Sequence, residues 1–387
     1  GNALAALRRD VALICELGLG YLELARSTST LSAGEAQRLQ LVRNISGGLS
    51  GLTVLLDEPT RGMHPREIDA LVKALRKITS GGNTAIVIEH DLGFIRASDH
   101  VVDMGPGPGV RGGRVVATGT PMEISRAEGA TARWLRRRSI VESRARRAAQ
   151  GWLTIEGARA NNLQNIDVRI PKGSLVGICG VSGSGKSTLI MDTLARVVAP
   201  KKHTTSVARE DLEPGAHDRI IGAPPRCVVL DQSREGIMSP GSYLGVKRAL
   251  IQLYTASEAA RALGLDQKAL AARCETCKGG GISRIDMGFL PNVHAPCEAC
   301  AGSGFAAEVN DVGVRGSALP ALLGKTIDEV LECWKDEPSV AGPLLHARTV
   351  GLGYLVLQQP ALALSGGEVQ RLRIARELGH KQGAGLY

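Results

Sequence analysis

The sequence predicts an α/β protein in which parallel-rich sheets are covered by helices and one set of motifs occurs twice. Short apolar strands alternate with helical segments, which is typical of parallel sheets. A glycine-rich loop lies between an apolar segment and a helical one. Residues 17–39 recur as residues 350–372, with 13 of 23 positions identical at a constant offset. A repeat of this size predicts two structurally related halves.

Length and composition narrow the class of protein. The 387 residues suffice for about two to three domains. No apolar run approaches the roughly 18–20 residues of a membrane-spanning helix, and the N-terminal stretch lacks the pattern of a signal peptide. We therefore expect a cytoplasmic protein without membrane insertion. The net charge of +9 favours polyanionic partners, and a glycine as first residue suggests a segment of something larger.

The elements follow in order along the chain. From Thr53, TVLLDEPTRGMHPREIDALVKALRKI predicts a buried strand, an acidic turn and an amphipathic helix, and NTAIVIEHDLGFIRAS repeats this pattern from Asn83. GGRVVATGTPMEI predicts a closing strand and helix. The second half opens with strands in GWLTIEGARANNLQNIDVRIP, followed by an apolar strand, LVGIC, and the helical STLIMDTLARVV. A further helical stretch is expected near residues 243–263.

A basic stretch separates the two halves. Residues 133–147 contain seven arginines in fifteen positions. A solvated linker helix explains this composition, and so does a patch that contacts the phosphates of nucleic acid. Both interpretations remain open.

The segment GVSGSGKS fits the phosphate-loop pattern G-x-x-x-x-G-K-[ST], in the required context between a strand and a helix. Its glycines let backbone N–H groups converge on phosphate oxygens at the positive end of a helix. Lys186 is placed to reach the β- and γ-phosphates, and the hydroxyl of Ser187 to ligate Mg²⁺. The candidate nucleotide-binding residues are Gly180, Ser182, Gly183, Ser184, Gly185, Lys186, Ser187 and Thr188.

Two strand ends carry candidate catalytic groups. Asp57 can hold Mg²⁺ through water and Glu58 can polarise the attacking water, although an acidic pair at a strand end is also ordinary turn chemistry. His90 ends the next strand, where it would bond the γ-phosphate or position the water. A packing role for this histidine is the alternative.

Four cysteines form two close pairs. Cys274, Cys277, Cys297 and Cys300 give the array C-x₂-C-x₁₉-C-x₂-C, and a glycine-rich turn follows each pair. Four thiolates in this spacing suit tetrahedral Zn²⁺ in a closed structural site; redox pairs or disulfides are the alternative. Between the pairs, basic residues flank an apolar tip at Met287, Phe289 and Leu290, which would meet DNA or pack on the sheet. The other cysteines, Cys15, Cys179, Cys227 and Cys333, are expected to be buried.

Together, the phosphate loop, the strand ends LLDEP and EHD, and the turns LSAGE and LSGGE resemble the ATP-binding-cassette (ABC) ATPases. In that family the LSGGE turn of one cassette closes over ATP held by the phosphate loop of the other. The resemblance implies nucleotide contacts from two signature turns: Ser32, Gly34, Glu35 and Gln37 in the first, and Ser365, Gly366, Gly367, Glu368 and Gln370 in the second. Gln232 stands where the family's Q-loop glutamine contacts Mg²⁺, although a polar strand end accounts for it equally well.

A narrower resemblance covers nearly the whole chain. The position of the zinc module, GFLP between its pairs, GVSGSGKSTL, GLGYL before each signature turn and MGPGPGVRGG resemble the UvrA family. This implies two fused ABC cassettes that form a homodimer and use ATP, Mg²⁺ and Zn²⁺. It also implies binding to damaged duplex DNA and transfer of the lesion to the other nucleotide-excision-repair subunits.

The sequence departs from the family pattern in two places. Ala33 replaces the first glycine of LSGGE, where a methyl group would crowd the phosphate or restrict the turn. The segment between Gln232 and Cys274 lacks the proline- and arginine-rich run expected after the Q-loop, and the aromatic, glycine-rich lead-in to the first cysteine pair is missing. These losses argue against normal DNA handling.

The expected domains are the later part of cassette one at residues 1–132, a basic linker at 133–150, and cassette two at 151–387 with the zinc module at about 270–305. By this assignment cassette one has no phosphate loop and cassette two has no acidic pair, so we expect an incomplete chain that binds nucleotide weakly and hydrolyses it poorly or not at all. A circularly permuted single cassette is the alternative, and the duplicated signature turn argues against it.

The leading functional prediction is a UvrA-type DNA-repair ATPase. A UvrA-like paralogue in drug resistance or self-protection is the first alternative. The ATPase subunit of a membrane transporter is the second, and the zinc insertion disfavours it. A non-catalytic module that binds zinc and DNA is the third.

Overall fold

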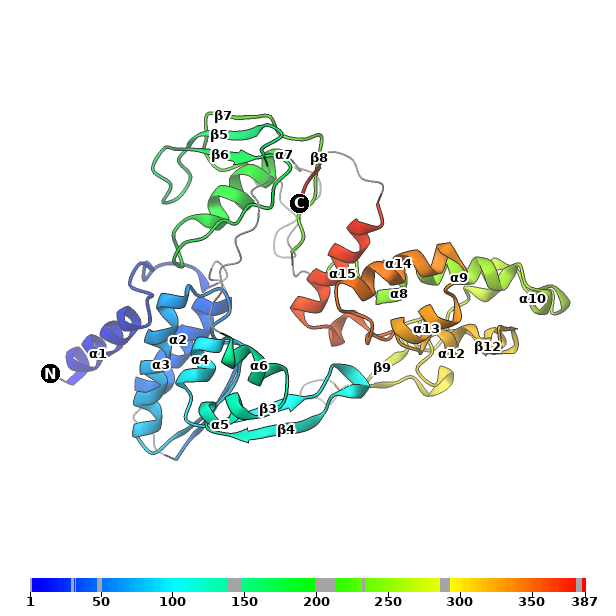
Figure 1. Cartoon of the computed structure of the whole chain (residues 1–387), viewed down its shortest axis with the longest axis horizontal. Helices are drawn as coiled ribbons and strands as arrows, with labels where there is room; N and C mark the ends of the chain where they lie inside the picture. Colours follow the sequence, from blue (N-terminus) through cyan, green and yellow to red (C-terminus); the bar gives the residue numbers. More distant parts are fainter. Residues whose placement is uncertain are drawn as a thin grey trace. The chain divides into compact units, whose positions relative to one another are not determined.

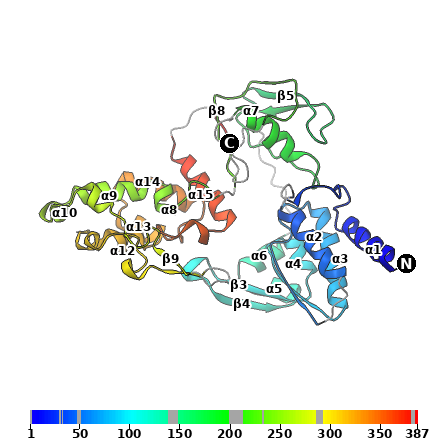
Figure 2. The same cartoon turned by 180° about the vertical axis from the view of Figure 1, so that it is seen from behind.

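The computed structural model describes residues 2–28, 31, 33–46, 51–137, 148–198, 213–231, 234–285, 293–380 and 385–387. The chain divides into two compact units, Gly1–Val197 with Glu213–Ala223, and Val198–Leu212 with Pro224–Tyr387. Many of their elements are labelled in Figure 1, and Figure 2 gives the reverse view. The expected linker at residues 133–150 lies within the first unit, and residues 138–147 are outside the described residues, so the cassette boundaries remain a prediction.

The first unit contains the elements α1 (Asn2–Glu16), α2 (Ala33–Ser46), β1 (Thr53–Asp57), α3 (Pro65–Ser80), β2 (Thr84–Ile88), α4 (Leu92–Ala97), β3 (Val101–Gly105), the short 3₁₀ turn η2 (Gly109–Arg111), β4 (Arg114–Gly119), α5 (Pro121–Arg126), α6 (Ala130–Arg136), β5 (Trp152–Ala158), β6 (Ile166–Pro171), the π-helical η3 (Thr188–Ala195) and β7 (Arg219–Ile221). The helix α7 (Arg196–Val198) lies at its boundary.

Strands β1 and β2 pair in parallel, with Thr53 opposite Thr84, as their alternation with helices predicts. Helix α3 begins at a capping box in which His64 and Glu67 each bond the other's backbone N–H, and Pro65 takes the first helical position. Its buried residues, which include Leu71, pack with β1 in one apolar cluster. The opposite face of the strands is exposed, as at Leu55.

The remaining pairings in the first unit are antiparallel: β3 with β4, and β5 with both β6 and β7. The strand expected at residues 175–179 is absent from the described structure, where these residues have no regular structure and Leu175 is fully exposed. An extended segment becomes a strand only when a neighbour accepts its ladder hydrogen bonds, and none of the described strands pairs with this one. The apolar sequence predicted the conformation but not the partner.

The second unit contains β8 (Arg226–Cys227), α8 (Pro240–Tyr243), α9 (Val246–Thr255), α10 (Glu258–Ala262), α11 (Gln267–Leu270), β9 (Ile282–Ile285), β10 (Val293–Pro296), the 3₁₀ turns η4 (Glu298–Cys300) and η5 (Ala307–Asp311), β11 (Gly313–Val314), β12 (Ser317–Ala318), α12 (Leu319–Leu323), α13 (Ile327–Cys333), α14 (Pro338–Thr349), the 3₁₀ turn η6 (Ala361–Ala363), α15 (Gly366–Leu378) and β13 (Gly385–Leu386).

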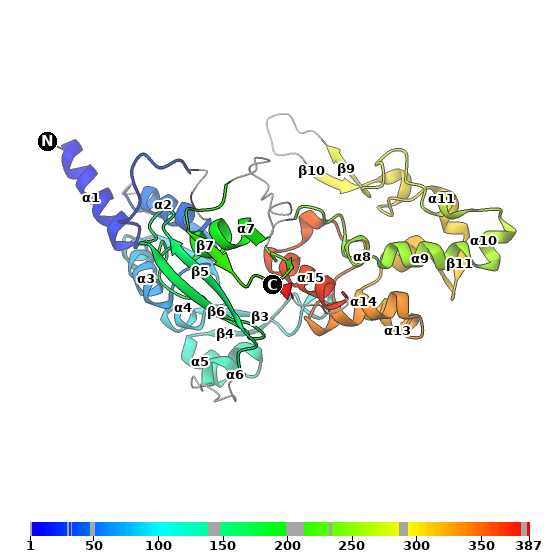
Figure 3. The same ribbon diagram turned by 90° about the horizontal axis from the view of Figure 1, so that it is seen from above.

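Helices α9 and α12 to α15 enclose the core of the second unit, where Tyr254 is fully buried. The Tyr254 hydroxyl donates to the carbonyl of Ser317 at 2.7 Å, which satisfies the one polar atom this ring brings into the core. Strand β13 pairs in parallel with β8, and β9 and β10 form the antiparallel hairpin that Figure 3 shows. No helix within the described ranges combines the length and the hydropathy needed to span a bilayer.

Candidate nucleotide and metal sites

The candidate phosphate loop lies between the irregular residues 175–179 and η3. Gly180, Gly183 and Gly185 have φ angles of 152°, 71° and 91°, a region that other residues adopt only with strain. A Cβ on Gly185 would lie 2.8 Å from the Leu163 side chain, so the loop also needs glycine for close packing. The Lys186 ammonium donates to the carbonyl of Gly180 at 2.8 Å, which holds its charge inside the loop.

Two asparagines before the loop fix its shape. The Asn162 amide donates to the carbonyl of Gly183 at 2.8 Å, and the Asn161 amide donates to the Thr188 hydroxyl at 3.3 Å. Asn161 has a φ of 51°. Sequence analysis missed these residues, although an adjacent Asn pair before a predicted strand is a recognisable turn signal.

A carboxylate from α3 binds the phosphate loop. One oxygen of Glu67 accepts from the Ser182 hydroxyl at 2.9 Å and from the Ser182 N–H at 3.3 Å. The same oxygen accepts from the His64 N–H at 2.7 Å in the capping box. Burial raises the pKa of Glu67, but these hydrogen bonds and the nearby Arg38 outweigh that effect, so the pKa lies below its ordinary value. Sequence analysis missed Glu67, although its spacing from His64 predicts a helix cap.

The segment before the first signature turn also reaches the phosphate loop. A Cβ on Gly183 would lie 2.8 Å from the ring of Tyr21, so the ring lies directly against the loop backbone. The Tyr21 hydroxyl donates to Glu35, and burial together with this carboxylate raises the pKa of Tyr21. Arg38, which is buried, donates to the carbonyl of Leu17 at 3.0 Å. The start of α2 is therefore held close to the loop within the first unit.

The predicted catalytic groups lie at the ends of β1 and β2. Parallel pairing places Glu58 and His90 at the same sheet edge, where Glu58 Oε1 and His90 Nδ1 are 3.9 Å apart. Glu58 has a φ of 45°, and His90 is 80% exposed. Asp57 precedes Glu58 and is exposed. In the part of the chain that the structure describes, no hydrogen bond or ion pair joins Glu58 or His90 to the phosphate loop.

Glu89 orders this sheet edge. Its carboxylate accepts from the N–H groups of Thr60 at 2.8 Å and His90 at 2.9 Å. Burial raises the pKa of Glu89, but bonds from Thr60, His90 and Asp91 outweigh it, so the pKa lies below its ordinary value. The turn after β1 is thereby tied to the turn after β2. Sequence analysis identified only the neighbouring His90.

The second signature turn caps α15 in the second unit. Ser365 and Glu368 form a capping box, with Ser365 N–H to Glu368 at 2.7 Å and Glu368 N–H to Ser365 at 3.2 Å. Gly366 is the first helical residue of α15, and Ala33 takes the corresponding first position of α2. The expectation that a methyl group at Ala33 restricts the turn or crowds the phosphate stays a prediction. The Gln370 amide donates to the carbonyl of Leu230 at 3.1 Å.

For several predicted residues, the whole residue or its side chain lies outside the described part of the structure. These are Ser32, Gly34, Gln37, Gln232, and the tip residues Met287, Phe289 and Leu290.

The four paired cysteines converge in the second unit. Their sulfur atoms all lie within 4.8 Å of one another. The Sγ atoms of Cys274 and Cys297 are 3.9 Å apart and those of Cys277 and Cys300 3.7 Å, far beyond a disulfide bond. A tetrahedral zinc with Zn–S bonds of about 2.3 Å places its sulfurs roughly 3.8 Å apart. The donor set therefore fits Zn²⁺.

Backbone amides support this cluster. The Gly281 N–H donates to the Cys277 sulfur at 3.3 Å, and the Gly304 N–H donates to the Cys300 sulfur at 3.1 Å. The backbone amides of Cys277 and Thr276 lower the pKa of Cys274 to about 7, which favours the thiolate that a metal requires. Both donating glycines come from the glycine-rich turns noted in the sequence.

The expectation that the remaining cysteines are buried is wrong. Cys15, Cys179 and Cys333 are exposed and Cys227 is half-buried, where desolvation raises the pKa of its thiol. Spacing excluded them from the metal cluster, but burial depends on tertiary contacts that a single residue type does not encode.

Comparisons with known proteins agree with this geometry. A family model described as ABC transporter matches residues 163–241, which include the phosphate loop, so the class is an ABC-type ATPase. UvrABC system protein A of Thermus thermophilus is 40% identical over 384 residues, 96% of this chain and 40% of that protein. Its counterpart in Methanothermobacter thermautotrophicus is 41% identical over 402 residues, 100% of this chain and 41% of that protein.

Among solved structures, the crystal structure of UvrA2 from Deinococcus radiodurans is similar with a TM-score of 0.88 at 37% identity, covering 97% of this chain and 46% of that one. The chain belongs to the UvrA family of ABC-type ATPases. It spans about 40% of the length of the curated relatives it matches.

Proposed function

We propose that this chain is part of a UvrA-type ATPase that couples ATP binding to recognition of damaged duplex DNA in nucleotide-excision repair. The observation that carries the proposal is the phosphate loop, with its three left-handed glycines and enclosed Lys186. Gly183 of this loop lies against Tyr21 of the first signature region, and Ser182 donates to Glu67 of α3. A loop of this shape presents backbone N–H groups to phosphate oxygens. The neighbouring signature region supplies the second wall of an ABC-type nucleotide site.

The residue roles follow from the proposed pairing of cassettes. Lys186 would bind the β- and γ-phosphates. Ser187 would ligate Mg²⁺ in the same composite site and Asp57 would hold Mg²⁺ in the other, where the ion would supply charge neutralisation. Glu58 would polarise the attacking water and His90 would contact the γ-phosphate. Gln232 and the two signature turns would complete the nucleotide contacts.

We expect this chain alone to bind ATP and to hydrolyse it slowly or not at all. In the proposed pairing, Lys186 and Glu58 belong to different composite sites. Equilibrium titration with ATP and Mg²⁺ tests the binding. Lys186→Ala should weaken ATP binding about tenfold or more, because a charge-assisted contact is lost. Lys73→Ala, an exposed lysine on α3, is the control. Unchanged affinity in Lys186→Ala would contradict the proposed nucleotide site.

Steady-state turnover tests the second half of this expectation. Phosphate release that is readily measured in this chain and is abolished by Lys186→Ala would overturn the assignment of Lys186 and Glu58 to separate sites. It would favour a permuted single cassette instead.

The proposed partners are damaged duplex DNA, the other repair subunits and a second copy of this chain, in the cytoplasm. The positive net charge supports DNA binding. Affinity for a lesion-bearing duplex should exceed that for the intact duplex at the same salt concentration. Equal affinities would favour the alternative of a UvrA-like paralogue.

A structural zinc is proposed at the four paired cysteines, on the sulfur distances and the two amide donors given above. Metal analysis of the purified chain should find about one zinc per chain. Retention of the fold and thiol protection after complete removal of metal would contradict a structural role.

A further inference from the structure

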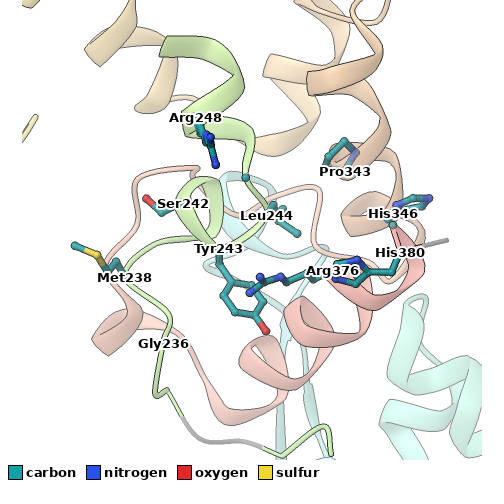
Figure 4. Close-up of a pocket in the computed structure, with 13 residues that line it drawn as sticks. Gly236, Met238, Ser242, Tyr243, Leu244, Arg248, Pro343, His346, Arg376 and His380 are labelled. Carbon is teal, nitrogen blue, oxygen red and sulfur yellow. The ribbon is translucent and has the colours of Figure 1, made fainter. Parts of the chain in front are cut away.

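A cavity in the second unit is lined by none of the phosphate-loop residues and none of the cysteines. Its volume is about 500 Å³, and it is bounded by α8, the start of α9, α14 and the end of α15 (Figure 4). Cavities of this volume are typical of sites for small organic ligands. The apolar part of its wall includes Met238, Leu244 and Pro343.

The polar side chains in this wall are mostly basic. Arg248, Arg376, His346 and His380 line the cavity, and none of the described lining residues is acidic. The Arg248 side chain forms no hydrogen bond or ion pair in the described part of the chain. Arg376 lies over the ring of Tyr243 with its guanidinium carbon 4.7 Å from the ring centre. Among the described residues, no carboxylate forms an ion pair with Arg376. Two guanidinium groups thus line one cavity, and neither has an acidic partner within the described ranges.

The histidine side of the cavity has an unsatisfied polar atom. His346 Nδ1 is buried and has no hydrogen-bond partner among the described residues. A Cβ on Gly379 would lie 3.3 Å from this nitrogen, so glycine keeps the ring edge uncrowded. A buried nitrogen without a partner is unfavourable, and a hydrogen bond to a ligand oxygen would remove this cost.

The acid that follows Arg376 in the chain does not neutralise this charge. Glu377 lies outside the lining and bonds Arg226, while its other oxygen is 3.8 Å from His380. That carboxylate is therefore already engaged, and the two arginines keep their positive charge available. Guanidinium groups bind phosphate oxygens through paired N–H donors, and an apolar wall accommodates an organic group beside them.

We propose that this cavity binds a phosphomonoester about the size of a mononucleotide. Arg248 and Arg376 hold the phosphate oxygens, His346 Nδ1 donates to the ligand in its Nδ1-protonated tautomer, and the wall formed by Met238, Leu244 and Pro343 covers the organic part. A free mononucleotide and the 5′-phosphorylated end of a DNA strand share this chemistry. The inference does not depend on the proposed ATPase function, because it uses none of the phosphate-loop residues.

Calorimetric titration of the whole chain tests the proposal in a Lys186→Ala background, which removes the contribution of the phosphate loop. AMP should bind saturably, and adenosine and inorganic phosphate should each bind at least tenfold more weakly. Arg248→Ala should weaken AMP binding about tenfold or more, and Arg248→Glu should weaken it further. Arg261→Ala removes the same charge from an exposed position of α10 outside the cavity lining and should leave AMP affinity unchanged.

Arg248 is exposed and forms no hydrogen bond or ion pair with its side chain among the described residues, so its variants should fold normally, as circular dichroism can verify. A 5′-phosphorylated oligonucleotide compared with its 5′-hydroxyl form identifies the source: Arg248-dependent preference for the phosphorylated form assigns the site to a strand end, and its absence assigns it to a free ligand. AMP binding that is undetectable, unaffected by Arg248→Glu, or matched by inorganic phosphate would overturn the proposal.

Discussion

The two signature regions make the same local contacts in different surroundings. Tyr21 donates to Glu35 in the first unit, and Tyr354 donates to Glu368 in the second. Arg38 bonds the carbonyl of Leu17, and its counterpart 333 positions later, Arg371, bonds the equivalent carbonyl of Val350. The glycine after each of these carbonyls has a similar φ, 73° and 77°. The repeated residues therefore encode one compact turn, whichever half contains it.

The surroundings of the two turns differ. In the first unit, Nη1 of Arg38 also lies 3.8 Å from Oε1 of Glu67. The carboxylate of Glu67 accepts a hydrogen bond from Ser182 of the phosphate loop. In the second unit, Gln370 of α15 bonds the carbonyl of Leu230 in the segment after β8. The motif therefore specifies its internal hydrogen bonds, whereas the segment that it contacts depends on which other part of the fold lies beside it.

The largest predicted effect comes from disrupting the cysteine cluster, which should destabilise the second signature region and leave the first unchanged. Gln358, in the segment before the second signature turn, donates to the carbonyl of Ser303 beside Cys300, so this region rests on the zinc module. Cys297→Ser should abolish zinc binding, whose free energy in small zinc domains is about 10 kcal/mol or more. Hydrogen exchange should then rise at residues 350–371 and stay unchanged at 17–38.

Cys333→Ser is the matched control, since Cys333 is exposed and far from the cluster in sequence. Equal acceleration of exchange in both regions would show that the cluster does not support the second region selectively.

The next largest effect concerns Leu39 of α2 and Leu372 of α15, which occupy equivalent positions in the repeat. Leu372 is fully buried in the core of the second unit, whereas Leu39 is half-buried in the first. Leu372→Ala should lower the free energy of unfolding by about 2–5 kcal/mol, and Leu39→Ala by distinctly less, because less apolar surface and cavity volume are lost. Denaturant unfolding of both variants gives the measurement. A larger loss for Leu39→Ala would contradict the burial difference.

A smaller effect concerns the carboxylate present only beside the first turn. Because the folded-state pKa of Glu67 is lowered, its stabilisation is present above the ordinary glutamate pKa and is lost as pH falls through the lower folded value. Glu67→Gln should cost about 1–3 kcal/mol at pH 7 and remove that acid dependence. Unfolding measured from pH 7 to pH 3 tests this.

Glu337→Gln is the control, since this residue caps α14 of the second unit. If Glu67→Gln and the unmodified chain lose stability in parallel on acidification, Glu67 is not the responsible group.

The smallest effect tests whether the two turns are equivalent. Tyr21→Phe and Tyr354→Phe each remove one hydroxyl hydrogen bond and should each cost about 1 kcal/mol. Burial and a bonded carboxylate raise the pKa of both phenols, so neither ionises near neutral pH. Thermal unfolding of the two variants should give similar shifts. A difference well beyond 1 kcal/mol would show that the surroundings change the turn itself.

Sequence reasoning succeeded where a contact is local or repeated. The parallel pair β1–β2, helix α3, the closing pair β4–α5 and the convergence of four cysteines followed from periodicity and spacing. It failed for the strand at residues 175–179 and for the burial of four isolated cysteines, because both depend on segments distant in sequence. It missed Glu67 and Tyr21, whose contacts with the phosphate loop cross more than 100 positions.

By itself, the sequence determined the conformations whose causes lie within a few residues: the left-handed glycines of the phosphate loop, the capping boxes of α3 and α15, and the chelating spacing of the cysteines. Only the tertiary structure decided which carboxylate meets Ser182 and where basic side chains gather without an acid. Backbone strain and short-range hydrogen bonds are set by neighbouring residues, whereas burial and charge pairing depend on every segment that packs against a group.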